Sequence, residues 1–232
     1  MNHVLLMMGG SGTRFGADIP KQFVEVGNRP VFSYIMEGYE KFIKADSIVL
    51  VCHESWIEFA KEWAEKLGIR KYVDTVAGGK NRSESVRNGL RRISKIAEDD
   101  DIVLIHDATH PYLDVTATAE AVIAAKEYGA ATLGQKQYDT VYRTDSEGNL
   151  TEVVPREQIV SGASPELFKF GFLHDLYERA SEEELAGFTS AGAIALASGV
   201  RMKVIPTMLV NLKITYKHDM ELFEKLFHGY YF

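Results

Sequence analysis

A glycine-rich run near the start of the chain carries the residue types that bind phosphate. Residues 9–23 read GGSGTRFGADIPKQF and contain two cations, Arg14 and Lys21. Glycines let backbone N–H groups approach an anion closely, while Arg adds a planar fork and Lys a point charge. Pro20 stiffens the segment that carries Lys21. The run favours a triphosphate site over the alternative of an ordinary glycine turn with surface cations.

The spacing of this run excludes one common nucleotide motif and weakens another. A Walker A loop needs a lysine directly after its last glycine, and none follows here until Lys21. A dinucleotide fingerprint needs G-x-G-x-x-G, whereas Gly10, Gly12 and Gly16 have a longer last interval, with no acidic residue about 20 positions on. An NAD(P)-binding protein is therefore the weaker hypothesis.

Apolar runs alternate with helical patterns over the first half of the chain. This βαβ order predicts an α/β fold with a largely parallel sheet covered on both faces. Ligands bind beyond the carboxyl ends of such strands, where the glycine-rich run and the segment HDATHP both fall. The expected strands are 3–8, 47–52, 71–76 and 101–108, and the expected helices are 31–44, 55–67, 82–95 and 115–128.

The pattern changes after Gly129. Two alternating segments, 130–145 and 150–162, flank the turn SEGN and predict a β-hairpin, or β-arm, at about 134–162. An isolated hairpin is marginal in water, so the arm should lean on something, for example a second subunit. Helices at 165–180 and 189–198, a strand at 202–207 and a last helix beginning at 216–219 follow. We expect one domain over residues 1–232.

Composition limits the partners. The chain has 232 residues, 46% of them hydrophobic, and a formal net charge of −7. This charge argues against a nucleic-acid surface and favours a small phosphorylated ligand met by a few placed cations. The single cysteine, Cys52, predicts a buried thiol and no internal disulfide. With no leader or long apolar span evident, we expect no membrane association and a cytoplasmic location.

Further motifs follow the glycine-rich run in order: GGKNRSESVRNGL, VLIHDATHP, YDTVYR, VPREQIVSGASPELF, GFTSAGA and NLKIT. Together they resemble the cytidylyltransferases that form CDP-linked sugar alcohols, namely the 2-C-methyl-D-erythritol 4-phosphate and ribitol-5-phosphate cytidylyltransferases. The resemblance spans nearly the whole chain. It implies a Rossmann-like, mostly parallel sheet of the nucleotidyltransferase (GT-A-like) type, and a protruding β-arm that embraces the second subunit of a homodimer.

The resemblance also implies roles on the CTP side. Arg14, Lys21 and Lys213 would stabilise charge on the α-phosphate, and Asp107 would orient the cofactor Mg²⁺, for which a carboxylate is a suitable hard ligand. Without the resemblance, Lys213 would be an exposed lysine. His106 is expected to be structural and Asp219 to cap a helix. The residues expected to contact CTP are Met8, Gly9, Gly10, Gly12, Gly78, Gly79, Arg82, Ser85 and Asp107.

The acceptor side departs from the family pattern. Where the family has an arginine in the motif HDAxRP, this chain has His110. The family's TPQ is replaced by SPE, which contains Glu166, and the family's TD is replaced by TS, which contains Ser190. A histidine with an ordinary pKa near 6.5 is mostly neutral at pH 7 and clamps phosphate less strongly. The arm retains the family's Thr140 and Arg156. The alternative to acceptor binding is that these two side chains pair with other polar groups within the hairpin. The residues expected to bind the acceptor are His110, Thr140, Arg156, Ser164 and Thr189.

These features predict a cytidylyltransferase that makes a CDP-alditol and pyrophosphate from CTP and a sugar-alcohol phosphate. The form GGSGTRFG and the presence of Trp56 in CHESWIEFA favour ribitol 5-phosphate as the acceptor. The alternatives are 2-C-methyl-D-erythritol 4-phosphate, an intermediate of isoprenoid synthesis, and a weakly active CTP-binding paralogue with a different acceptor.

Overall fold

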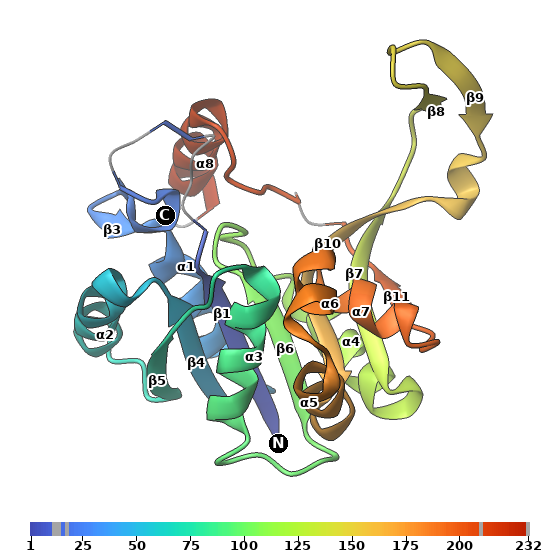
Figure 1. The fold of residues 1–232 in the computed structure, drawn as a ribbon. Helices are drawn as coiled ribbons and strands as arrows, with labels where there is room; N and C mark the ends of the chain where they lie inside the picture. Colours follow the sequence, from blue (N-terminus) through green and yellow to red (C-terminus); the bar gives the residue numbers. More distant parts are fainter. Residues whose placement is uncertain (11–14, 17–18, 209–210, 231–232) are drawn as a thin grey trace.

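The computed structural model describes residues 1–10, 15–16, 19–208 and 211–230. Gly12 and Arg14 of the predicted phosphate loop lie outside the described residues. Within the described part, one seven-stranded sheet forms the centre of the molecule (Figure 1). Its strands, in spatial order, are β11 (Lys203–Pro206), β7 (Ala130–Lys136), β10 (Val160–Lys169), β6 (Ile102–Asp107), β1 (Asn2–Met8), β4 (Ser47–Cys52) and β5 (Tyr72–Ala77).

The sheet is mostly parallel, as predicted. Only β10, among its described strands, runs antiparallel to its neighbours β6 and β7. The register pairs Met7 of β1 with Asp107 of β6, and Met8 of β1 with Cys52 of β4. The carboxyl ends of these three strands therefore meet at one edge, and the loops that follow β1 and β6 become neighbours.

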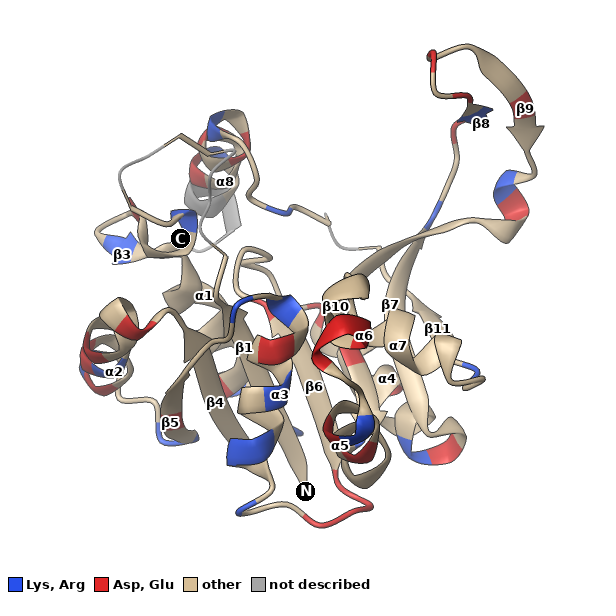
Figure 2. Ribbon diagram, viewed as in Figure 1, with Lys and Arg blue, Asp and Glu red and all other residues tan. Residues whose placement is uncertain are grey.

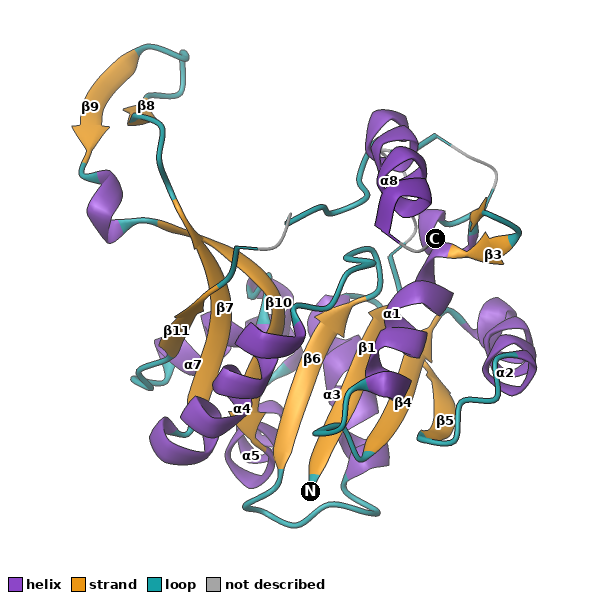
Figure 3. Ribbon diagram, turned by 180° about the vertical axis from the view of Figure 1, so that it is seen from behind, coloured by secondary structure: helices purple, strands orange, loops and turns teal. Residues whose placement is uncertain are grey.

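Helices cover both faces of the sheet (Figures 1 and 3). Side chains alternate along β1: Val4, Leu6 and Met8 enter the core on one face, and Leu5 and Met7 enter the core on the other. The first face carries α1 (Val31–Lys41), α2 (Ile57–Lys66) and α4 (Val115–Tyr128), and the second carries α3 (Arg82–Ile93), α5 (Phe170–Arg179), α6 (Glu182–Gly187) and α7 (Ala191–Ala197).

The predicted arm is present. The chain between the paired strands β7 and β10 projects away from the sheet and ends in a hairpin of β8 (Val141–Thr144) and β9 (Leu150–Val154) (Figure 1). At the hairpin turn, Oδ1 of Asp145 accepts hydrogen bonds from the backbone N–H groups of Glu147 and Asn149, both at 2.9 Å. Tyr142, Leu150 and Val153 expose apolar surface on this arm.

One predicted element is wrong over part of its length. The helix expected at 165–180 begins only at Phe170, because the preceding residues belong to β10. There Glu166 and Leu167 pair with β6 on one side and β7 on the other, and this tertiary pairing overrides the local helical pattern. The sequence reading also missed α6 and the short hairpin of β2 (Glu25–Val26) and β3 (Arg29–Pro30).

The last helix, α8 (Lys217–Tyr230), packs against α1 through an edge-to-face contact of Phe223 with Tyr34, with ring centroids 5.1 Å apart. Residues 211–216, which lead into α8, pass over the carboxyl edge of the sheet (Figure 3). Oδ2 of Asp219 accepts backbone hydrogen bonds from Thr215 and Tyr216, both at 2.8 Å, which agrees with the predicted capping role at the start of this helix.

Candidate functional site

A cavity of about 330 Å³ opens at the carboxyl ends of β1 and β6, beside the start of α3. Gly78, which was also predicted to contact CTP, is not among the residues that line this cavity. It directly precedes the lining residue Gly79, and its N–H donates to the Cys52 carbonyl at 2.7 Å. The acidic run at 98–101 lies at the opposite end of β6 (Figure 2). The sequence-predicted residues that line the cavity are Met8, Gly9, Gly10, Lys21, Gly79, Arg82, Ser85, Asp107 and Lys213.

Gln22 connects the described start of the glycine-rich run, at Met8 and Gly10, to the segment that carries Lys21. Its amide Nε2 donates to the carbonyl of Met8 at 2.6 Å and to that of Gly10 at 2.9 Å, and the side chain is buried. Pro20 precedes a single 3-10 turn, Lys21–Phe23, that presents Lys21 to the cavity. Gln22 was not predicted as a site residue. The one indication in the sequence was its position directly after Lys21.

The second glycine turn requires its glycine. A Cβ atom on Gly79 would lie 2.3 Å from Cβ of Glu84, too close for any other residue to fit without a shift. Oγ of Ser85 accepts from the Gly79 N–H at 3.0 Å and donates to the Asn81 carbonyl at 2.8 Å. Oδ1 of Asn81 accepts from the Glu84 N–H and caps α3. The turn is thereby fixed against the helix that begins with Arg82.

Asp107 is the centre of the charged cluster. Its Oδ1 accepts from Nη2 of Arg82 at 3.0 Å, and its Oδ2 accepts from Nζ of Lys213 at 2.9 Å. Burial alone would raise the pKa of Asp107, but the charges of Arg82 and Lys213 outweigh it and hold this pKa well below its usual value. The backbone of Ile214 donates to Thr109 at 2.9 Å, which ties the lysine's segment to the loop after β6.

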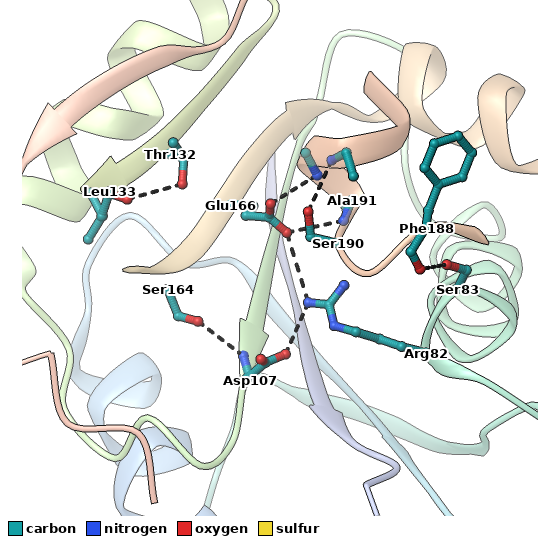
Figure 4. Close-up of polar contacts among 12 residues, drawn as sticks. Arg82, Ser83, Asp107, Thr132, Leu133, Ser164, Glu166, Phe188, Ser190 and Ala191 are labelled. Atoms are coloured by element: carbon teal, nitrogen blue, oxygen red, sulfur yellow. Dashed lines mark hydrogen bonds and ion pairs between the residues drawn. The ribbon is translucent and has the colours of Figure 1, made fainter. Parts of the chain in front are cut away.

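A second cavity, of about 300 Å³, adjoins the first and shares Arg82, Asp107 and Lys213 with it. Oε1 of Glu166 accepts from the backbone N–H of Gly192 at 2.9 Å, and Oε2 accepts from that of Ala191 at 3.2 Å. Figure 4 shows Glu166 directed toward Ala191 at the start of α7. The predicted acceptor residues that line this cavity are His110, Ser164 and Thr189, together with Glu166 and Ser190.

His110 is a neutral group in this cavity. Burial, with the positive charge of Lys213 nearby, lowers its pKa to about 3, so the imidazole carries no charge near pH 7. His106 is structural, as predicted: its Nε2 lies 3.0 Å from the carbonyl of His110 and its Nδ1 lies 2.8 Å from the Tyr39 hydroxyl. Because a carbonyl only accepts, Nε2 carries the proton and Nδ1 accepts from Tyr39. Burial lowers the pKa of His106 to about 4.

The two predicted arm residues are not brought to the site within the single chain. Thr140 and Arg156 are exposed, and neither lines either cavity. Arg156 instead donates to the Tyr138 carbonyl and lies 3.6 Å from Oε1 of Glu157, both on its own arm.

Several residues of the first cavity were not predicted. They are Met7, Gln22, Lys80, Asn81 and Thr109, and two of them, Lys80 and Asn81, stand inside the motif GGKNRS. The thiol of Cys52 is buried, as predicted, and burial raises its pKa to about 12. None of the described helices is long and apolar enough to cross a membrane.

Comparisons with known proteins show the family to which this chain belongs. Residues 2–228 match the family model described as "IspD: 2-C-methyl-D-erythritol 4-phosphate cytidylyltransferase". The 2-C-methyl-D-erythritol 4-phosphate cytidylyltransferase of Thermotoga neapolitana is 36% identical over 96% of this chain and 95% of its own length. The ribitol-5-phosphate cytidylyltransferase of Lacticaseibacillus paracasei is 27% identical over 95% of each.

A solved structure agrees as well. A crystal structure of 4-diphosphocytidyl-2C-methyl-D-erythritol synthase superposes with a TM-score of 0.78 at 26% identity, covering 97% of this chain and 98% of the other. The predicted nucleotidyltransferase fold is therefore confirmed, and the family match extends over nearly the whole sequence. The chain belongs to the IspD family of cytidylyltransferases, enzymes of the nucleotidyltransferase class.

Proposed function

We propose that this enzyme transfers CMP from CTP to a sugar-alcohol phosphate and releases pyrophosphate. The observation that carries the proposal is the pair of adjoining cavities, which meet at Arg82, Asp107 and Lys213. A donor in the first cavity and an acceptor in the second would meet at this cluster. Holding two reactants in one geometry removes much of the entropic cost of a bimolecular reaction.

The first cavity suits CTP. Gly9, Gly10 and Lys21 line the part that would hold the phosphates. Backbone N–H groups of glycines and the charge of a lysine are groups that bind phosphate. The turn fixed by Ser85 would hold the base. Arg14 and Gly12 are proposed for the same phosphates on the strength of the motif that contains them.

The reaction needs charge stabilisation more than a base. A phosphate monoester has a second pKa near 6, so at pH 7 the acceptor is largely a dianion and already nucleophilic. One of its oxygens bonds to the α-phosphorus of CTP, and the bond from that phosphorus to the β-bridging oxygen breaks. Pyrophosphate leaves with the electron pair. Lys21 and Lys213 would offset the charge that develops during this exchange.

Mg²⁺ is the proposed cofactor, with Asp107 as its protein ligand. The donor set fits: one carboxylate faces the first cavity among the described lining residues, and Mg²⁺ is commonly held by one or two carboxylates plus substrate phosphates. The described residues contain no cluster of three or more potential metal ligands, so CTP would supply the remaining oxygens. When bound, the ion would neutralise charge on the triphosphate.

The acceptor is proposed as ribitol 5-phosphate, on the form of the glycine-rich loop and the presence of Trp56. The relatives carry both names: one of those reported above is a ribitol-5-phosphate enzyme and another a 2-C-methyl-D-erythritol 4-phosphate enzyme. The second acceptor therefore stands as the alternative.

We further propose that the enzyme works in the cytoplasm as a homodimer in which the arm of one subunit completes the site of the other. Two features support the dimer. The arm exposes apolar side chains, and its Arg156 lines neither cavity of its own chain. An exposed hairpin gains stability when a partner covers it.

The test is pyrophosphate release from CTP and Mg²⁺ with a panel of sugar-alcohol phosphates that includes ribitol 5-phosphate and 2-C-methyl-D-erythritol 4-phosphate. The proposal expects release that depends on both CTP and one member of the panel. No release with any member, by protein that still binds CTP, would support the alternative of a CTP-binding paralogue.

A further inference from the structure

The second cavity contains as many carboxylates as side-chain cations. Among its described lining residues, the cations are Arg82 and Lys213 and the acids are Asp107 and Glu166, while His110 is neutral. Arg82 and Lys213 both hydrogen-bond Asp107, so their charge is concentrated where the two cavities join. Beyond this junction the one cation near Glu166, among these described residues, is Arg82, which lies 3.9 Å from Oε2 of Glu166 and also pairs with Asp107. The rest of this part of the cavity suits uncharged polar groups.

Glu166 is the carboxyl group in that part; burial raises its pKa above the ordinary value, and the charge of Arg82 opposes this rise. It comes from β10, where Pro165 precedes it and the register with β7 shifts between Ala163 and Glu166. The backbone N–H groups of Ala191 and Gly192 fix its two oxygens, and Arg82 lies 3.9 Å from Oε2 (Figure 4). The side chain is 18% exposed and lines the cavity, so it is held in place yet accessible to a ligand.

A carboxylate held in this way still has room for hydrogen bonds. Its two oxygens offer about four lone-pair positions, of which the two N–H groups occupy only part, and an ionised carboxylate accepts but does not donate. Its ideal partners are therefore the O–H groups of a ligand. The neighbouring side chains that line the cavity with hydroxyl groups are Thr132, Ser164, Thr189 and Ser190.

We propose that Glu166 is a specificity-determining residue whose carboxylate accepts hydrogen bonds from hydroxyl groups of the acceptor's carbon chain. This inference rests on the proposed function. The reacting phosphate lies at the junction beside Lys213, and the polyol chain extends along the cavity to Glu166. The enzyme thereby favours a hydroxyl-rich chain long enough to reach this carboxylate over a short one with the same phosphate.

The experiment compares Glu166→Gln with the wild-type enzyme in steady-state pyrophosphate release, using ribitol 5-phosphate and the shorter glycerol 3-phosphate as acceptors. The KM for ribitol 5-phosphate should rise about tenfold or more, as expected for losing hydrogen bonds to a charged group. The KM for CTP and the weaker activity with glycerol 3-phosphate should change much less. Glu183→Gln, an exposed carboxylate on α6, is the matched control and should behave as wild type.

Thermal unfolding of each variant separates recognition from folding. If Glu166→Gln does not fold, Glu166→Asp takes its place. This variant keeps the carboxylate but shortens the side chain by one methylene group, so the same rise in acceptor KM is expected. A folded variant with an unchanged KM for ribitol 5-phosphate, or an equal loss with both acceptors, overturns the inference and leaves the proposed function standing. A wild-type enzyme that uses no sugar-alcohol phosphate overturns both.

Discussion

Nζ of Lys213 lies 2.9 Å from Oδ2 of Asp107, although 106 positions separate the two residues in the sequence. The same carboxylate accepts from Arg82 at the start of α3. Three segments of the chain therefore converge on one charged cluster: the end of β6, the start of α3 and the segment before α8. The cluster is also the place where the two cavities join.

The lysines of the first cavity should act on the chemical step. Lys21→Ala and Lys213→Ala are each expected to lower kcat about 100-fold or more, because each removes charge that stabilises the transition state. The KM for CTP should change less. Steady-state kinetics measure both values, and Lys95→Ala, an exposed lysine beyond the far end of α3, is the control. Near-normal kcat in both cavity variants would contradict the mechanism.

The second glycine turn should tolerate no side chain. Gly79→Ala places a Cβ against Glu84, and overpacking of this kind costs about 1–3 kcal/mol in stability or in CTP affinity. Thermal unfolding and calorimetric titration with CTP measure the two effects. Gly187→Ala is the matched control, since nothing lies within 4 Å of the added atom. Equal behaviour of the two variants would show that the close approach at Gly79 has no role.

The arm should act on the site of a second subunit. We expect the Arg156→Ala variant and the Lys213→Ala variant each to lose activity when assayed alone. A mixture of the two variants should recover part of the wild-type activity. In a mixed dimer, one site combines an intact Lys213 with an intact arm from the other chain. The measurement is pyrophosphate release from the mixture after subunit exchange. A mixture no more active than its components would place Arg156 outside the partner's site.

Stability should fall in mild acid because two histidines, the buried His106 and the partly buried His110, stay neutral in the folded chain. The folded pKa of His110 is about 3, whereas an unfolded histidine has a pKa of about 6.5. Between these values the unfolded chain binds a proton that the folded chain does not, so the free energy of unfolding decreases as pH falls from 7 to 5. His106 adds to the effect. His110→Asn should lose less stability over this interval in urea unfolding, and an unchanged loss would refute the burial argument.

The sheet and its order of helices could be predicted because β1, β4 and β6 are continuous apolar runs, the pattern of strands buried on both faces. The residue at which α5 starts could not be predicted from the sequence. Residues 165–169 have a helical pattern, and only their pairing with both β6 and β7 makes them a strand. Local pattern does not contain that information.

The site divides in a similar way. The glycine turns and Asp107 were found from the motifs, and the structure gathers them around one cavity. Gln22 was missed, because its two hydrogen bonds reach carbonyls 12 and 14 positions away. Glu166 was noticed only as a departure from the family pattern. Its position against the start of α7 depends on β10, the strand that the sequence reading had partly assigned to a helix.

The central claim, transfer of CMP to a sugar-alcohol phosphate, is tested most directly by ³¹P nuclear magnetic resonance of the reaction products. CTP, Mg²⁺ and ribitol 5-phosphate are incubated with the wild-type enzyme and with Lys213→Ala. With the wild-type enzyme, the acceptor's monoester signal should be replaced by a pair of coupled diphosphate signals together with pyrophosphate, and the variant should form them far more slowly. Persistence of the monoester signal for this acceptor and for every other sugar-alcohol phosphate tried would refute CMP transfer by this enzyme.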